Sequence, residues 1–377
     1  MGLTVEVVHK ISDRAASGRK PDEQPSKILV RPTVDTADRK AERMPDQVAD
    51  QLAFARVFIN ARDAVEEEYY TDLARRHSPA DLRRQYLTSM AKPLVGRALG
   101  GPVEFYDTWG RIMRHAWLSL SFGVYDARHR ALPDPVTRLA AAQVNTVDLA
   151  WEPALAMAPA EPLLVDVGTG RGNSAARLAL AHPAARVVTL TLSPEQAEIA
   201  RRITTRLGVA DRVEVRVADV LDPAATADLV GQADGVTAIE VVGHFPPDRA
   251  ADGVRTMAAL LKPGAPLTLM EPVLNRPGSL VHDFAGLFTW RFRPATDYCD
   301  ALRTAGLNGL RLTDLTKAYW PSWRDTGAVM AARLDRLRAE FGPVLAHTWQ
   351  RIFQYQAWPL GRTVHYARMT GYRPGPR

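Results

Sequence analysis

From Leu163 onward, short apolar runs alternate with segments whose apolar residues recur at helical spacing. Each run has the length of a buried strand, and each intervening segment is long enough to cross over a sheet, so the pattern indicates βαβ units. The predicted strands are Leu163–Val167, Val187–Leu192, Val213–Val217, Gly235–Glu240 and Leu267–Met270. The predicted helices between them are Ser174–Ala181, Pro194–Leu207, Ala224–Val230 and Pro247–Leu261. The pattern therefore predicts an α/β fold with a parallel sheet.

After the fifth strand the order of elements changes. A predicted long helical insertion over Arg324–Ala357 separates the last two strands, and its bulky residues recur near a spacing of three and four, which indicates one apolar helical face. The elements around it are a helix at Thr296–Ala305, a strand at Leu310–Leu315 and a last strand at Thr363–Thr370.

The chain before the first strand has a polar start followed by helical patterns. Residues 1–44 lack a clear period, so we expect a mobile segment with a short ordered piece at Leu3–Val8. The predicted helices begin at Pro45, after Ser78 as an N-cap, at Leu87 (ending at Leu99), and after Pro133 (ending near Met157). We therefore expect a mobile segment at 1–44, a helical lid or dimerisation region at 45–132, and a core at 133–377 with a cap insertion at 323–358.

Composition narrows the class of protein. The 377 residues carry a formal charge of +6, but the basic residues are spread through the helical patterns, which indicates a solvated surface or a field favouring an anionic small substrate rather than nucleic-acid binding. The single cysteine, Cys299, excludes a disulfide framework and a multi-thiolate metal site and fits a reducing compartment. No apolar stretch approaches about 20 residues and no apolar leader is visible, so we expect a cytoplasmic protein without a membrane span.

The first predicted strand runs into a glycine loop that opens a helix. The segment is Leu164-Val165-Asp166-Val167-Gly168-Thr169-Gly170-Arg171-Gly172-Asn173. Glycines let the backbone approach a ligand closely, and the helix N-terminus presents free N–H groups to it. A dinucleotide site would need G-x-G-x-x-G and an acid at the end of the second strand, but this loop reads G-x-G-x-G and that strand ends in Thr191. No Lys-Ser or Lys-Thr pair follows the glycines, which excludes a P-loop.

The pattern from Asp166 to Gly172 resembles motif I of the class I S-adenosylmethionine-dependent methyltransferases. The resemblance continues in a second-strand run similar to that of the cyclopropane-synthase and sterol-methyltransferase branch, where T-L-S-x-x-Q replaces the usual ribose-binding acid. The matching segments are Val188-Thr189-Leu190-Thr191-Leu192-Ser193-Pro194-Glu195-Gln196, Ala218-Asp219-Val220 and Leu261-Lys262-Pro263-Gly264. The resemblance implies a Rossmann-like core over Pro133–Pro374 with a mostly parallel sheet and an antiparallel last strand.

The resemblance also implies S-adenosylmethionine as the cofactor and S-adenosylhomocysteine as its product. Asp166 would accept from loop N–H groups or contact the methionine ammonium, and such charge-assisted bonds are strong. Thr191 and Gln196 would bond the ribose hydroxyls, and Asp219 would accept from the adenine amino group beside the Val220 N–H. The implied cofactor-binding set is Asp166, Gly168, Thr169, Gly170, Gly172, Asn173, Thr191, Leu192, Gln196, Asp219, Val220 and Glu240.

Two further runs resemble sterol and isoprenoid C-methyltransferases. They are Phe105-Tyr106-Asp107 with Trp117–Phe122, and Ala238–Pro246, which carries an I-E-x-x-x-H pattern. Glu240 is the first candidate for catalysis, as a proton acceptor or a ligand of a cation, with cofactor orientation as the alternative. His244 would act as a base or orient the substrate, or else cap the next helix. Gly243 stands where cyclopropane synthases carry glutamate, which argues against cyclopropanation.

These observations favour a methyltransferase of bacterial secondary metabolism that acts on a hydrophobic small molecule, with an isoprenoid carbon as the preferred acceptor. No cluster of His, Cys and Asp has metal-ligand spacing, so magnesium would enter only with a diphosphate substrate. A peptide substrate, for example a C-terminal carboxylate, and a pericyclase-like protein that retains the cofactor without methylation are the alternatives. We expect no nucleic-acid or membrane partner, and a homodimer through the N-terminal helices remains open.

Overall fold

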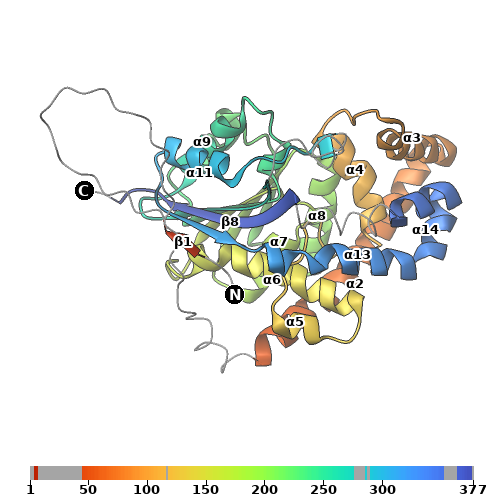
Figure 1. The fold of residues 1–377 in the computed structure, drawn as a ribbon, viewed down its shortest axis with the longest axis horizontal. Helices are drawn as coiled ribbons and strands as arrows, with labels where there is room; N and C mark the ends of the chain where they lie inside the picture. Colours follow the sequence, from red (N-terminus) through yellow and green to blue (C-terminus); the bar gives the residue numbers. More distant parts are fainter. Residues whose placement is uncertain are drawn as a thin grey trace, which may run out of the picture.

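The computed structural model describes residues 4–6, 45–115, 118–275, 285–286, 289–351 and 363–375. Its described strands form one sheet in the order β1-β7-β8-β6-β5-β2-β3-β4 (Figure 1). The strands are β1 (Thr4–Glu6), β2 (Leu163–Val167), β3 (Arg186–Thr191), β4 (Val213–Val217), β5 (Gly235–Ile239), β6 (Pro266–Leu274), β7 (Asn308–Asp314) and β8 (Val364–Tyr372). Strands β2 to β6 pair in parallel, and β8 runs antiparallel to both β6 and β7. The predicted Rossmann-like sheet with an antiparallel last strand is thus confirmed.

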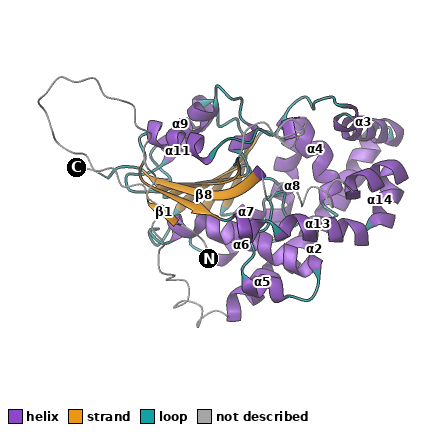
Figure 2. Ribbon diagram, viewed as in Figure 1, coloured by secondary structure: helices purple, strands orange, loops and turns teal. Residues whose placement is uncertain are grey.

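Helices cover both faces of this sheet (Figure 2). One face carries α6 (Pro135–Leu155), α7 (Asn173–Ala181) and α8 (Pro194–Arg206), and the other carries α9 (Ala250–Leu260) and α11 (Ala295–Thr304). Because both faces are covered, the central strands are buried on both sides rather than alternating between buried and exposed residues. No described helix is long and apolar enough to cross a membrane.

A second group of helices lies beyond one end of the sheet (Figure 1). It combines the N-terminal helices α2, α3 and α4 with the insertion between β7 and β8, although these segments lie far apart in the sequence. Helix α2 packs on α6 and α8, and α13 packs on α6. The bounds are α2 (Pro45–Arg76), α3 (Pro79–Ala91), η2 (Pro93–Val95), α4 (Pro102–Met113), α5 (Ala127–Ala131), α12 (Thr316–Tyr319), α13 (Pro321–Ala332) and α14 (Leu334–Phe341), and a further helix covers 343–351.

Several predicted helices differ from those observed. The helix predicted over Leu87–Leu99 is wrong, because α3 ends at Ala91 and a 3-10 turn follows from Pro93, whose ring removes a backbone donor and restricts the residue before it. Ser78 stands at the N-cap of α3, but its side chain makes no capping bond. The segment predicted as a helix over Ala224–Val230 is a 3-10 segment, η3 (Pro223–Leu229), kinked at Thr226.

The insertion predicted as one long helix is divided. Helix α13 ends before Arg333, whose φ of −109° and ψ of 14° are not helical, and α14 ends at Gly342, which has a φ of +84°. Residues 352–362 lie outside the described residues, so the last part of the predicted insertion is not covered. Helix α9 also begins at Ala250, later than the predicted Pro247.

Candidate active site

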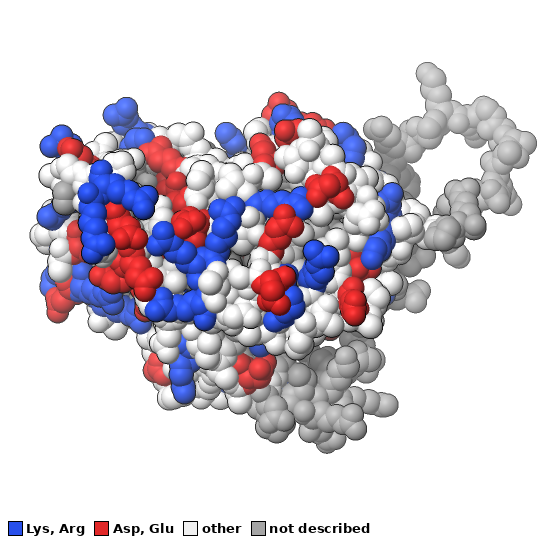
Figure 3. Space-filling view, turned by 180° about the vertical axis from the view of Figure 1, so that it is seen from behind, with Lys and Arg blue, Asp and Glu red and all other residues white. Residues whose placement is uncertain are grey.

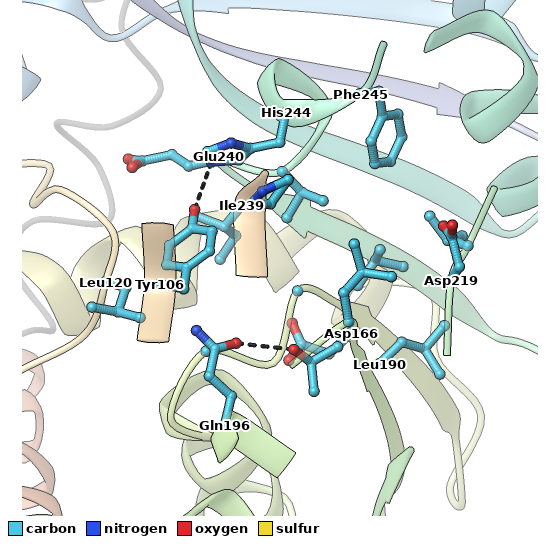
Figure 4. Close-up of a pocket in the computed structure, with 18 of the residues that line it drawn as sticks. Tyr106, Leu120, Asp166, Leu190, Gln196, Asp219, Ile239, Glu240, His244 and Phe245 are labelled. Carbon is cyan, nitrogen blue, oxygen red and sulfur yellow. Dashed lines mark hydrogen bonds between the residues drawn. The ribbon is translucent and has the colours of Figure 1, made fainter. Parts of the chain in front are cut away.

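The loops that follow β2, β3, β4 and β5 meet at the carboxyl edge of the sheet, where open α/β sheets bind ligands. A cavity of about 330 Å³ lies there (Figure 4). Among the predicted site residues, those that line it are Asp166, Gly168, Gly170, Asn173, Thr191, Leu192, Gln196, Asp219, Val220, Glu240 and His244. Thr169 and Gly172 belong to the same loop but are not in the cavity wall. The sheet topology therefore brings together residues that lie up to about 80 positions apart in the sequence.

The glycine loop after β2 needs its glycines for different reasons. Gly168 has a φ of +90°, and a Cβ there would come within 2.4 Å of Val241 Cγ2. Gly172 is the N-cap of α7 with a φ of +81°, and a Cβ there would lie 3.1 Å from that of Ala200. Gly170 also has a positive φ, +54°, but a Cβ on it would meet nothing within 4 Å. The free space at Gly170 belongs to the cavity.

Asp166 and Thr169 are held by threonine hydroxyls. Thr189 Oγ1 donates to Asp166 Oδ2 over 2.8 Å and lies 2.7 Å from Thr169 Oγ1. Burial raises the pKa of Asp166 to about 6, although the bonds from Thr189 and Ser174 oppose this shift. The expected bonds from loop N–H groups to Asp166 are absent among the described contacts, because Gly168 N and Thr169 N donate to Leu190 O instead. Thr169 thus supports the loop from beneath the cavity.

The run after β3 forms a compact polar turn. Ser193 caps α8, since its hydroxyl accepts from Gln196 N over 3.0 Å. Thr191 Oγ1 donates to Gln196 Oε1 over 2.9 Å, so these two residues bind each other. Gln196 Nε2 is buried and has no hydrogen-bond partner among the described residues. A buried donor without a partner is costly, so this amide nitrogen is available to an acceptor on a ligand.

Asp219 and Glu240 occupy opposite ends of the cavity (Figure 4). Asp219 follows β4, is exposed, and accepts from Leu221 N over 2.8 Å through Oδ1. Val220 beside it is 5% exposed. The carboxylate of Asp219 is therefore fixed by a backbone bond and still open to a second donor.

Glu240 stands directly after β5, one residue beyond the end of the strand. Its φ of +57° lies in the left-handed region, which non-glycine residues adopt rarely and mostly where the surroundings enforce it. Glu240 Oε1 accepts from Phe122 N over 3.0 Å and from the Tyr366 hydroxyl over 2.9 Å. Burial raises the pKa of Glu240 to about 8, against the opposing effect of these two bonds. A strained, anchored carboxyl group with a pKa in this range fits an acid–base role.

The neighbouring turn is held by a second buried carboxyl group. Glu271 Oε1 on β6 accepts from Val241 N over 2.9 Å and from Val242 N over 2.7 Å. Burial raises the pKa of Glu271 to about 7, while these backbone bonds lower it. Glu271 therefore fixes the backbone that carries Glu240.

His244 lies in the short 3-10 turn η4 (Val242–His244) and points to α4. Its Nε2 lies 2.8 Å from the Tyr106 hydroxyl (Figure 4). Its Nδ1 lies 3.2 Å from both oxygens of Thr289. Burial lowers the pKa of His244 to about 3, so the ring is neutral near pH 7. The alternative that His244 caps the next helix is wrong, because Arg249 holds that position.

The cavity also contains residues that sequence reasoning did not assign to the site. They include Pro102, Tyr106, Leu120, Ser121 and Phe245 in its wall, with Tyr366 behind Glu240. Tyr106 belongs to a run that resembled C-methyltransferases, so its signal was present in the sequence. No sequence pattern near Tyr366 indicates a place in the site, because strand β8 brings this residue to Glu240 from 126 positions away.

Comparison with known proteins agrees with this geometry. Residues 164–264 match a methyltransferase domain family, and these residues include the glycine loop, Asp219 and Glu240. The chain thus carries a methyltransferase domain, as expected from its resemblance to the class I S-adenosylmethionine-dependent methyltransferases. A relative of this chain, the O-methyltransferase cnsE of Penicillium expansum, is 31% identical over 189 residues, which are 48% of this chain and 66% of that protein. The chain spans less than two thirds of the length of this and other curated relatives that it matches.

Solved structures share the fold of this chain. Geranyl diphosphate C-methyltransferase from Streptomyces coelicolor A3(2), crystallised with Mg2+, geranyl diphosphate and S-adenosyl-L-homocysteine, has a TM-score of 0.53 and 20% identity, with 67% of this chain and 89% of that chain covered. The cyclase SpnF has a TM-score of 0.55 and 19% identity, with 78% of this chain and 94% of that chain covered. Since a methyltransferase and a cyclase share this fold, the fold alone does not decide the activity.

Proposed function

We propose that the protein transfers a methyl group from S-adenosylmethionine to a hydrophobic small molecule. The observation that carries this proposal is the single cavity that joins the glycine loop and Asp219 at one end to Glu240, His244 and Tyr106 at the other. A group bound along the first part would present its reactive end to the second, and proximity and alignment are the main requirements of methyl transfer.

The residues of the first part fit the cofactor. The open space at Gly170 leaves room for a ligand against the backbone, and the N-terminus of α7 supplies N–H groups to a polar group. The unpartnered Gln196 Nε2 suits a ribose hydroxyl, and the exposed Asp219 carboxylate suits the adenine amino group. The cofactor, when bound, supplies a methyl group activated by a positively charged sulfur.

At the acceptor end of the cavity, Glu240 and His244 have different roles. Glu240 can take a proton from the acceptor, because its anionic form is the less favoured one in this buried position and readily binds a proton. His244 remains neutral and orients Tyr106, whose hydroxyl it contacts, so it is a positioning group rather than a base. Leu120 and Ile239 in the wall favour an apolar acceptor and exclude water.

The acceptor class follows from these surroundings and from the relatives. An apolar cavity end with a buried carboxyl group suits the phenols, enols or alkenes found in small natural products, and an isoprenoid carbon is our preferred acceptor. The named relatives and neighbours that methylate include an O-methyltransferase and a geranyl diphosphate C-methyltransferase. Magnesium would enter only with a diphosphate acceptor, as the metal of that substrate.

The charge distribution supports a small molecule rather than nucleic acid as the partner. On the face shown in Figure 3, basic and acidic side chains are interspersed over the helices. A nucleic-acid footprint would instead gather basic residues into one stripe or patch.

The test is to incubate the purified protein with methyl-labelled S-adenosylmethionine and a small-molecule extract of its host. The expected result is label in an organic-soluble product together with S-adenosylhomocysteine, and loss of both with Glu240→Gln. Label that enters only peptides would support a peptide substrate. Tight cofactor binding with no label transferred and no S-adenosylhomocysteine, across extract and peptides, would refute methyl transfer and favour a non-methylating, pericyclase-like role.

A further inference from the structure

Arg171 sits inside the glycine loop, but its side chain is not in the cavity wall. It is buried, 3% exposed, and forms an ion pair through Nε with Oε1 of Glu66 on α2. Burial by itself lowers the pKa of Arg171, but Glu66 and Tyr70 together raise the pKa above its ordinary value, so the charge is retained. An ion pair thus connects the charged Arg171 of the glycine loop to helix α2, which lies outside the sheet.

The backbone of Arg171 lies between two glycines with separate tasks. Gly170 borders the cavity, and Gly172 caps α7. Any rotation of the backbone at Arg171 turns the peptide groups that face the cavity, because glycine offers little resistance to a change in φ. Fixing the Arg171 side chain therefore fixes the conformation of the loop that would hold the cofactor.

Helix α4 leaves space for the Arg171 side chain at Gly110. A Cβ on Gly110 would lie 2.8 Å from Arg171 Nη1 and 3.1 Å from Nη2. Glycine weakens the middle of a helix, so its presence at this contact is explained by the close approach of the guanidinium group. Arg171 is therefore enclosed by α2 on one side and α4 on the other.

The same two helices also hold the turn after β3. Tyr70 lies one helical turn after Glu66 on α2, and its hydroxyl donates to Glu195 Oε1 over 3.0 Å. Ser193 Oγ, at the N-cap of α8, donates to Asp107 Oδ1 on α4 over 2.5 Å. The N-terminal helices thus contact two of the loops that form the cofactor end of the cavity, the glycine loop and the turn after β3.

We infer that Glu66 is a positioning residue for the cofactor: through Arg171, the N-terminal helices hold the glycine loop in its binding conformation. This inference rests on the proposed function, because it concerns the cofactor of that reaction. It assigns the N-terminal helices a task in cofactor binding, beyond those of a lid, a dimer contact or a substrate wall.

The test compares Glu66→Gln with Glu340→Gln. Glu340 on α14 is a matched control, since it bonds Arg111, Arg114 and His115 within the same group of helices but contacts neither the glycine loop nor the turn after β3. Arg114 also lies 3.8 Å from Glu66 Oε2, so the Glu340 variant also controls for a disturbed ion pair at Arg114. Each full-length variant is titrated with S-adenosylhomocysteine by calorimetry, and its KM for S-adenosylmethionine and kcat are measured. We expect Glu66→Gln to raise Kd and KM roughly tenfold or more with a smaller fall in kcat, and Glu340→Gln to leave Kd and KM within about twofold.

A second variant, Gly110→Ala, acts on Arg171 without removing a charge. It restores helix propensity in α4 but crowds the guanidinium group, so a positioning role predicts weaker cofactor binding in a helix that is intrinsically more stable. It decides the question if Glu66→Gln fails to fold.

Unchanged affinity in Glu66→Gln and in Gly110→Ala, or an equal loss in Glu66→Gln and Glu340→Gln, would overturn the inference. Failure of the unaltered protein to bind S-adenosylhomocysteine would instead refute the proposed function, and the inference with it.

Discussion

Replacing Gly170 by alanine separates backbone strain from cofactor binding. Gly170 has a φ of +54°, so an alanine there costs about 1–2 kcal/mol of stability through the left-handed backbone. A Cβ at this position meets nothing within 4 Å, so the substitution adds no clash to the protein itself. The added methyl group does stand in the cavity, in space that we assign to the cofactor.

The size of the binding defect follows from overpacking. Forcing an extra methyl group against a well-packed neighbour costs about 1–3 kcal/mol, which corresponds to roughly a 5- to 150-fold loss of affinity. Gly208 is the matched control, because it has a φ of +70°, also meets nothing within 4 Å and lies after α8, away from the cavity wall. Both alanine variants should therefore lose similar stability.

The assay is thermal unfolding together with calorimetric titration of S-adenosylhomocysteine. Gly170→Ala should bind at least about fivefold more weakly than the unaltered protein, whereas Gly208→Ala should bind normally. Equal affinity in the two variants would refute the assignment of the space at Gly170 to the cofactor.

Three further predictions concern the carboxyl groups of the site. Glu240→Gln should lower kcat about 100- to 10,000-fold with little change in Kd for S-adenosylhomocysteine. The kcat of the unaltered protein should rise as the pH passes through about 8, because Glu240 accepts a proton only in its anionic form. A pH-independent kcat, or full activity of the variant, would exclude the base role. Asp219→Ala should weaken S-adenosylhomocysteine binding roughly 10- to 150-fold, as expected for the loss of a hydrogen bond to a charged group. Normal binding of this variant in calorimetry would show that Asp219 does not bind the cofactor. Burial raises the folded-state pKa of Glu240 to about 8 and of Glu271 to about 7, above the ordinary glutamate pKa of 4.5 in the unfolded chain, so the folded protein binds protons more tightly. The stability from this source therefore falls as the pH rises above about 4.5, and it is lost once the pH has passed the folded-state values. Thermal unfolding between about pH 5 and 9 should show a Tm that falls and then levels off above about pH 8, with a smaller fall in Glu271→Gln, and a rising Tm would contradict these shifts.

The predictable parts of the fold are those that residues close together in the sequence determine. The strand Leu163–Val167 and the glycine loop after it are visible because apolar runs and left-handed glycines act within a few residues. The divided insertion was not predictable, because its apolar period continues across Arg333 while the backbone there leaves the helix. The apolar period indicates which face of a helix is buried, but it does not indicate where packing against neighbouring elements interrupts the helix.

The candidate site was predictable as a set of positions but not as a set of contacts. The pattern singled out Glu240, yet the bonds that hold it come from Phe122, 118 positions away, and Tyr366, 126 positions away. His244 was visible as a histidine, but its neutral state depends on burial that only the folded structure provides. Arg171 is part of the predicted glycine loop, and nothing in the sequence near it indicates its partner Glu66.

The most direct test of the proposed function is a crystal structure of the protein with S-adenosylhomocysteine. We expect adenine beside Asp219, ribose beside Gln196, the amino-acid part on the loop from Gly168 to Gly172, and the sulfur facing the end of the cavity that holds Glu240. A ligand bound elsewhere, or in this cavity with its sulfur turned away from Glu240, would contradict it.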